Sequence, residues 1–119
     1  MVVARTLFQS ACVILSIENR HLKIQALNSP IDDESVNMMM LETEKILQQE
    51  QPFTSMWDLR ECHMPSVAVT WKCIRWAVKH KTELDHYNTE LTIECNNRLR
   101  KIVNLVLRVF RPKCPVNVL

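Results

Sequence analysis

The chain contains no glycine in 119 residues. Glycine readily adopts a positive φ angle and lets the backbone approach a bound phosphate closely. A Walker A loop and a GxGxxG dinucleotide-binding turn need glycine at fixed positions, so neither can occur here. Asparagine tolerates the left-handed conformation better than most residues. We therefore expect tight turns to use Asn19, Asn28, Asn88 and Asn96.

The cysteines and histidines lack the spacing of a structural metal site. The cysteines are Cys12, Cys62, Cys73, Cys95 and Cys114. Neither a CxxC nor an HxxxH pair occurs, although Cys62, Cys73, His63, His80 and His86 are ligand types. Zinc sites normally use closely spaced pairs, so we expect no metal and no other cofactor. An odd number of cysteines without a disulfide framework indicates reduced thiols and a cytoplasmic protein.

Long apolar runs and C-terminal acidic residues are also missing. No apolar run reaches the roughly 18 residues that span a bilayer. The apolar stretch near the N-terminus is broken by Gln9, Ser10 and Ser16, so we expect no cleaved signal. No acidic residue follows Glu94. Six basic residues do: Arg98, Arg100, Lys101, Arg108, Arg111 and Lys113.

The overall composition is that of a single globular domain covering residues 1–119. Apolar residues make up 47% and charged residues 24% of the chain. The formal net charge is only +2, so no strong field recruits nucleic acid. We expect no nucleic-acid partner.

The pattern of apolar residues predicts alternating strands and helices. Strands are predicted over Ala11–Ile17, His21–Leu27, Phe53–Leu59, Glu90–Cys95 and Val116–Leu119. Helices are predicted over residues 32–49, 66–87 and 98–110. The order β-β-α-β-α-β-α-β indicates the α/β class, with a single mixed, mainly parallel sheet and crossover helices. Asn19 is expected to hold the positive φ angle of the turn between the first two strands.

Two of the predicted helices carry apolar stripes. In the second, Val67, Trp71, Ile74 and Val78 recur at helical spacing and predict the core face, which leaves Trp76 off the core. In the last helix, one face is expected to be buried: Leu99, Ile102, Val103, Val106 and Phe110. Leu105, Leu107 and Val109 lie off that face, and we expect some of them to remain exposed, as at an interaction site.

Several segments together resemble the STAS, or SpoIIAA-like, family of anti-sigma factor antagonists and transporter tail domains. They are FTSMWDLREC, MPSVAV, NNRLRKIVNLVLRVF and PVNVL, from Phe53 onward. The Sec14-like lipid-binding lobe has a related architecture. The resemblance implies a SpoIIAA-like α/β fold and a regulatory, protein-binding role. It also places Ser66 where antagonists accept phosphate, although Pro65 stands where the family has Asp and no Gly follows.

The predicted partner surface is the start of the second long helix, Ser66 to Thr70. It includes Ser66, Val67, Thr70 and the nearby Arg60. Ser66 is interpreted either as a phosphoacceptor or as an ordinary N-cap of the helix. The last helix, basic and apolar, lies beside this surface and could contact a protein or a membrane surface.

A second predicted site is an anion site at the carboxyl ends of two strands. Asn96, Asn97 and Arg98, with Arg60 and Ser66, follow strands that end at Leu59 and Cys95. Open α/β sheets usually bind ligands at this edge, and helix N-termini offer free N–H groups to anions.

The function that these features favour is binding. We expect a non-catalytic regulatory or protein-interaction module. The alternative is a Sec14-like domain that binds a lipid or an anionic ligand. A third possibility is an enzyme with Cys95 as nucleophile and His63 or His86 as base. It is not expected, because such a site needs a base oriented by a third group, a geometry that the sequence does not show. Whether the chain forms a homodimer is left open.

Overall fold

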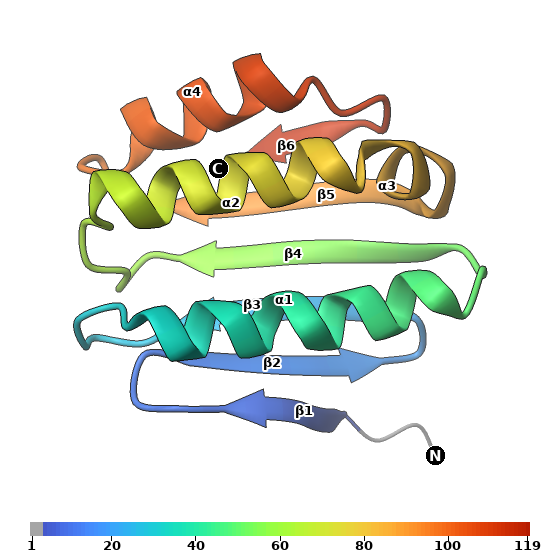
Figure 1. Ribbon diagram of the computed structural model, residues 1–119, viewed down its shortest axis with the longest axis horizontal. Helices are drawn as coiled ribbons and strands as arrows, with labels where there is room; N and C mark the ends of the chain where they lie inside the picture. Colours follow the sequence, from blue (N-terminus) through green and yellow to red (C-terminus); the bar gives the residue numbers. More distant parts are fainter. Residues whose placement is uncertain (1–3) are drawn as a thin grey trace.

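The computed structural model describes residues 4–119 and contains one six-stranded sheet with the strands in sequence order. The strands are β1 (Arg5–Gln9), β2 (Val13–Glu18), β3 (His21–Ala26), β4 (Phe53–Leu59), β5 (Asn88–Cys95) and β6 (Val116–Val118). The helices are α1 (Asp33–Gln48), α2 (Val67–Lys79), α3 (Lys81–Tyr87) and α4 (Arg100–Phe110). Figure 1 shows α1, α2 and α4 side by side in front of the sheet.

The sheet is mixed and mainly parallel, as predicted. β1, β2 and β3 pair antiparallel, and β3 to β6 pair parallel. Each parallel pair requires a crossover, and α1, α2 with α3, and α4 provide them. The parallel strands β3, β4 and β5 therefore end at one edge of the sheet, where the chain enters α1, α2 and α4.

One element, β1, was not predicted, and one predicted helix is divided in two. β1 lies in the apolar stretch near the N-terminus, whose first three residues lie outside the described part. An irregular register between Thr6 and Phe8 interrupts its alternation, which explains why the pattern was weak. The predicted helix 66–87 is two helices, because His80 (φ −101°, ψ 14°) leaves the helical conformation between α2 and α3.

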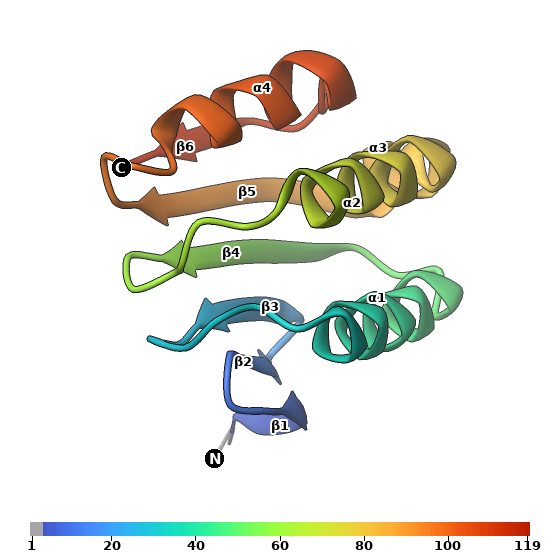
Figure 2. The same cartoon turned by 60° about the vertical axis from the view of Figure 1, so that its left-hand side comes forward.

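The two faces of the sheet differ in character. On the face under the helices lie the fully buried Leu15, Leu22, Leu91 and Ile93. Strand register places a mainly polar row on the opposite face, made of Ser16, Lys23, Thr92 and Asn117 with the apolar Met56 among them. Figure 2 shows α1 and α2 on the same side of the sheet when it is turned. The helix-covered face is therefore the core side of the domain.

The predicted orientation of α2 is wrong. Val67, Trp71 and Val78 are exposed, by 75%, 44% and 48%, and only Ile74 of the predicted stripe is buried. Trp76, expected off the core, is half-buried and packs against the core cluster. The reason is that α2 is apolar on more than one side, so spacing alone does not identify its buried side.

The turns use fewer asparagines than expected. Asn19 has a φ of 49°, as predicted, but Asn28, Asn88 and Asn96 do not have a positive φ. The other positive φ angles belong to Arg20, Glu50 and Arg111. Arg20 is held there by its own guanidinium group, which donates to the carbonyls of Gln51 (2.9 Å) and Pro52 (3.1 Å). Side-chain anchoring thus replaces glycine at this turn.

Candidate functional site

The carboxyl edge of the sheet contains a depression of about 510 Å³. Its lining residues include Asn28, Arg60, His63, Asn96, Asn97 and Arg98. The structure thus brings together four residues of the predicted anion site, from the β4–α2 and β5–α4 loops. Ser66 begins α2 at the same edge but does not line the depression.

Arg60 is engaged by two carboxylates in this depression. Its Nε and Nη2 atoms donate to Oδ1 and Oδ2 of Asp58 at 2.9 and 2.8 Å, and Nε lies 3.2 Å from Oε2 of Glu94. The hydrogen bond from Arg60 lowers the pKa of the Asp58 carboxyl, although burial alone would raise it. Because two negative groups already neutralise Arg60, this guanidinium is poorly placed to attract an anion.

Asn96 joins the two loops of the depression. Its Nδ2 atom lies within hydrogen-bonding distance of three carbonyl oxygens, those of Leu59 (3.5 Å), Arg60 (3.1 Å) and Cys62 (3.4 Å). Its Oδ1 atom accepts from the backbone N–H of Leu99 at 3.1 Å, in the turn before α4. The N-cap position of α4 itself is Leu99, which makes no side-chain cap hydrogen bond. Asn96 instead holds the turn that precedes α4, and its contacts with both loops make it a structural clamp.

Ser66 caps α2 and is also exposed. Its Oγ atom accepts from the backbone N–H of Val69 at 3.1 Å, and its carbonyl accepts from both the N–H and the hydroxyl of Thr70. Its role as the N-cap of α2 is therefore enough to account for a serine at this position, without any ligand. The same position leaves the hydroxyl accessible to solvent at a helix N-terminus, where the dipole favours added negative charge.

An exposed apolar strip runs along α2 and α4, and the predicted partner surface at the start of α2 contains one end of it, Val67. We define it by the exposed apolar side chains Val67, Trp71, Val78, Leu105 and Val109. The last two were among the residues of α4 expected to remain exposed in part. The signal for the first three was present, since α2 is too apolar to bury every such side chain against one sheet.

The surroundings of the apolar strip are strongly basic. No Asp or Glu occurs between Cys62 and Thr82, or after Glu94. The six basic residues of the two helices are Lys72, Arg75, Lys79, Arg100, Lys101 and Arg108. Lys72 pairs with Asp33 of α1 at 2.8 Å, on the side of α2 that faces α1. The strip therefore combines exposed apolar area with an excess of positive charge.

Cys95, the candidate nucleophile of the enzyme alternative, lies in the core. Cys95 is 9% exposed and packs with Leu91 and Ile93 in the core. His63, one of its proposed bases, pairs with Asn28 instead, through Nε2 and Oδ1 at 2.7 Å. Burial raises the pKa of the Cys62 thiol to about 11. In residues 4–119, no group of three His, Cys, Asp or Glu side chains could hold a metal ion.

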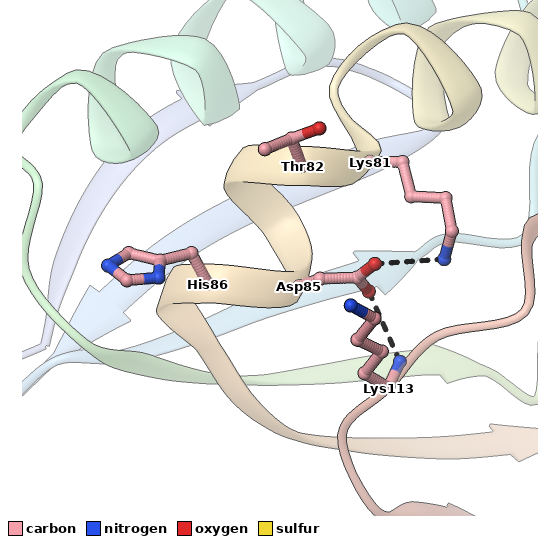
Figure 3. Close-up of a pocket in the computed structure, with 5 residues that line it drawn as sticks. All are labelled: Lys81, Thr82, Asp85, His86 and Lys113. Carbon is pink, nitrogen blue, oxygen red and sulfur yellow. Dashed lines mark hydrogen bonds and ion pairs between the residues drawn. The ribbon is translucent and has the colours of Figure 1, made fainter.

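A second depression, of about 440 Å³, lies by α3 and is a structural junction (Figure 3). Asp85 accepts from Nζ of Lys81 at 2.9 Å and from the backbone N–H of Lys113 at 3.1 Å. Lys81 also donates to the carbonyl of Arg111 at 2.6 Å. These contacts bind α3 to the segment between α4 and β6. His86 points away from Asp85 and both lysines.

None of the helices in residues 4–119 is long and apolar enough to cross a membrane. The chain matches no family model, no curated protein and no solved structure.

Proposed function

We propose that the protein is a non-catalytic binding module that docks a partner protein through the start of α2. The observation that carries the proposal is the exposure of large apolar side chains there, above all Val67 and Trp71. Fully burying a side chain of valine size contributes about 1.5–3 kcal/mol. Exposed apolar groups clustered on one surface mark interaction sites more often than scattered ones do.

Ser66 gives this docking surface a means of regulation. Its hydroxyl is exposed directly beside Val67, and it caps the helix through an acceptor oxygen. Phosphorylation would add roughly −1.5 to −2 charge at this point. The added charge and its hydration would disfavour burial of Val67 against a partner. A kinase would thus release the partner without unfolding the domain.

The STAS-like relationship and the cytoplasmic location are parts of the same proposal. The sequential parallel strands β3 to β6 with their crossover helices are compatible with that family, and Ser66 stands at the start of the second long helix. The five cysteines are unpaired, which suits a reducing compartment.

The alternative function, binding of a lipid or another anionic ligand, has weaker support. The depression at the carboxyl edge contains Arg60 and Arg98, but Asp58 and Glu94 neutralise the first. Asn96 uses its side chain for the loop carbonyls and for Leu99. A ligand at this edge would therefore depend mainly on Arg98 and its neighbour Asn97.

Photo-crosslinking in the native cell tests the proposed docking surface. A photoreactive residue is placed at Val67, and a matched control at the exposed Glu18, at the end of β2. We expect a discrete protein adduct from position 67 that is absent from position 18, and a lower yield when Ser66→Asp is added. Absence of an adduct at position 67, or identical adducts from both positions, would contradict the proposal.

A further inference from the structure

We infer that the partner contributes an acidic amphipathic helix, which lies lengthwise over the apolar strip between α2 and α4. The inference rests on the proposed function and specifies the chemistry of its partner. The contacts of α2 with α1 and α4 determine which sides of α2 and α4 are exposed. These sides carry the apolar and charged residues on which the inference depends.

One side of α2 is occupied by α1. Lys72 pairs with Asp33, and Nε1 of Trp76 donates to Oε1 of Glu44 at 2.9 Å. At about 100° per residue, Val67 lies on the side of the helix opposite Trp76. Val67, Trp71 and Val78 fall within about 40° of one another by the same rotation. This apolar side of α2 is therefore directed away from α1, towards α4.

α4 presents apolar residues to the same seam. α2 and α4 are in contact and run in the same direction, since each follows one of the parallel strands β4 and β5. Parallel helices on one sheet present opposite sides to each other, as α1 and α2 do. With Val103 and Phe110 buried against the sheet, the side of α4 that faces α2 carries Leu105 and Val109.

The outermost positions of this surface are cationic. Arg75 and Lys79 of α2, and Lys101 and Arg108 of α4, are exposed and lie on the sides turned away from the sheet. The apolar strip therefore lies closer to the sheet than these cations do, between two rows of positive charge. A flat membrane would meet the cations before the apolar side chains. A single helix can seat its apolar face in the seam and extend carboxylates to both rows.

The dimensions of the apolar strip suit a short helix. Val67 and Val78 are eleven positions apart in one helix, which corresponds to about 16 Å along its axis, or three helical turns. Helices that bind in this manner use apolar residues at i, i+3, i+4 and i+7. We therefore expect a partner segment of about three turns, with Asp or Glu flanking that apolar pattern on both sides.

Peptide selection tests the chemistry of the partner. The probe is a displayed library of 14-residue helical peptides with leucine fixed at i, i+3, i+4 and i+7 and with Glu, Lys or Gln allowed at the flanking positions. We expect selection on the folded domain to enrich Glu on both flanks. We expect the selected peptide to lose about 30-fold in affinity with Trp71→Ala, a loss typical of a central aromatic contact.

Matched variants separate this surface from general effects. Met38→Ala removes an exposed apolar side chain of α1, outside the apolar strip, and should leave the affinity unchanged. Arg75→Glu should weaken binding, whereas Arg5→Glu on β1 should not. Because these side chains are exposed, each variant should fold, and circular dichroism verifies this.

Three results would overturn the inference. They are selection without enrichment of Glu, equal effects of Trp71→Ala and Met38→Ala, and binding of phosphatidylserine vesicles in place of the peptides. If position 67 still yields a specific protein adduct in the cell, only the acidic helix is refuted and the proposed function stands. If that adduct is also absent, both fail.

Discussion

Replacing Asn96 with alanine should destabilise the domain more than an ordinary loop substitution. The change removes the acceptor for the N–H of Leu99 and the donor that reaches the carbonyls of Leu59, Arg60 and Cys62. Loss of the side-chain acceptor for the N–H of Leu99 costs about 1 kcal/mol. Each lost hydrogen bond adds about 0.5–1.5 kcal/mol, and one NH₂ group can donate two. We expect a total loss of about 2–4 kcal/mol.

The expected change in melting temperature follows from the size of the chain. Unfolding entropy near 60 °C is about 2.1 cal/mol/K per residue, so a chain of 119 residues should lose about 4 °C in Tm per kcal/mol. Asn96→Ala should therefore melt about 8–16 °C below the wild type. Differential scanning calorimetry measures the shift, and urea unfolding gives the free energy independently.

Two further variants divide the effect of Asn96 into its parts. Asn96→Ser retains an acceptor for the N–H of Leu99 but loses the amide donor, so it should recover about 1 kcal/mol of the loss. Asn97→Ala changes the exposed neighbour and should stay within about 0.5 kcal/mol of the wild type. If Asn96→Ala is as stable as Asn97→Ala, the clamp between the two loops does not exist. If the serine variant equals the alanine variant, the acceptor for the N–H of Leu99 contributes nothing.

Three further predictions concern contacts elsewhere in the structure. The folded-state pKa of Asp58 is lowered by Arg60, so its stabilising effect is present above the carboxyl pKa of the unfolded chain, about 3.9, and is lost as pH falls through the folded value. Urea unfolding from pH 7 to 2 should show a smaller acid-induced loss for Asp58→Asn than for the wild type, and parallel profiles would contradict this. Cys62, with a pKa of about 11, should be alkylated at pH 7.5 at least about 100-fold more slowly than an unhindered cysteine; equal rates by mass spectrometry would exclude the raised value. Glu44→Ala leaves Nε1 of Trp76 without its acceptor, so we expect a loss of about 1–3 kcal/mol and altered tryptophan fluorescence, and an unchanged urea midpoint would refute the bond.

The strands were predictable because their patterns are short, apolar and bounded by turn residues. Phe53–Leu59 was predicted with the bounds that the structure has, and the two preceding strands within two residues. The turn between β2 and β3 was found from Asn19, whose side chain tolerates a positive φ. Local chemistry determines these features, so the sequence alone reveals them.

The orientation of α2 could not be read from spacing because it depends on tertiary contacts. Ile74 shares a stripe with Trp71 and Val78, yet it alone of these three is buried. The contacts of Lys72 and Trp76 with α1 fix the rotation of the helix, and these partners lie more than 30 positions away in the sequence. The same contacts decide which apolar residues form the strip.

The candidate anion site illustrates the same limit. The sequence placed Arg60 and Asn96 correctly at one edge of the sheet, because parallel strands end together. It did not show that Asp58 and Glu94 surround the guanidinium, or that the amide of Asn96 is used by three carbonyls. Residue types and spacing located Arg60 and Asn96 at this edge of the sheet. Only the hydrogen bonds and ion pairs of the structure showed that both side chains are already occupied.

Oxidative footprinting in the native cell tests most directly whether the apolar strip is a docking surface. Hydroxyl radicals modify exposed Trp and Met side chains, and the ratio of modification in the cell to that in the purified domain is measured for Trp71 and Met38. Both are exposed in the free domain, by 44% and 37%. We predict that the ratio falls for Trp71 and stays near that of the whole surface for Met38. Equal ratios for the two residues would contradict the account.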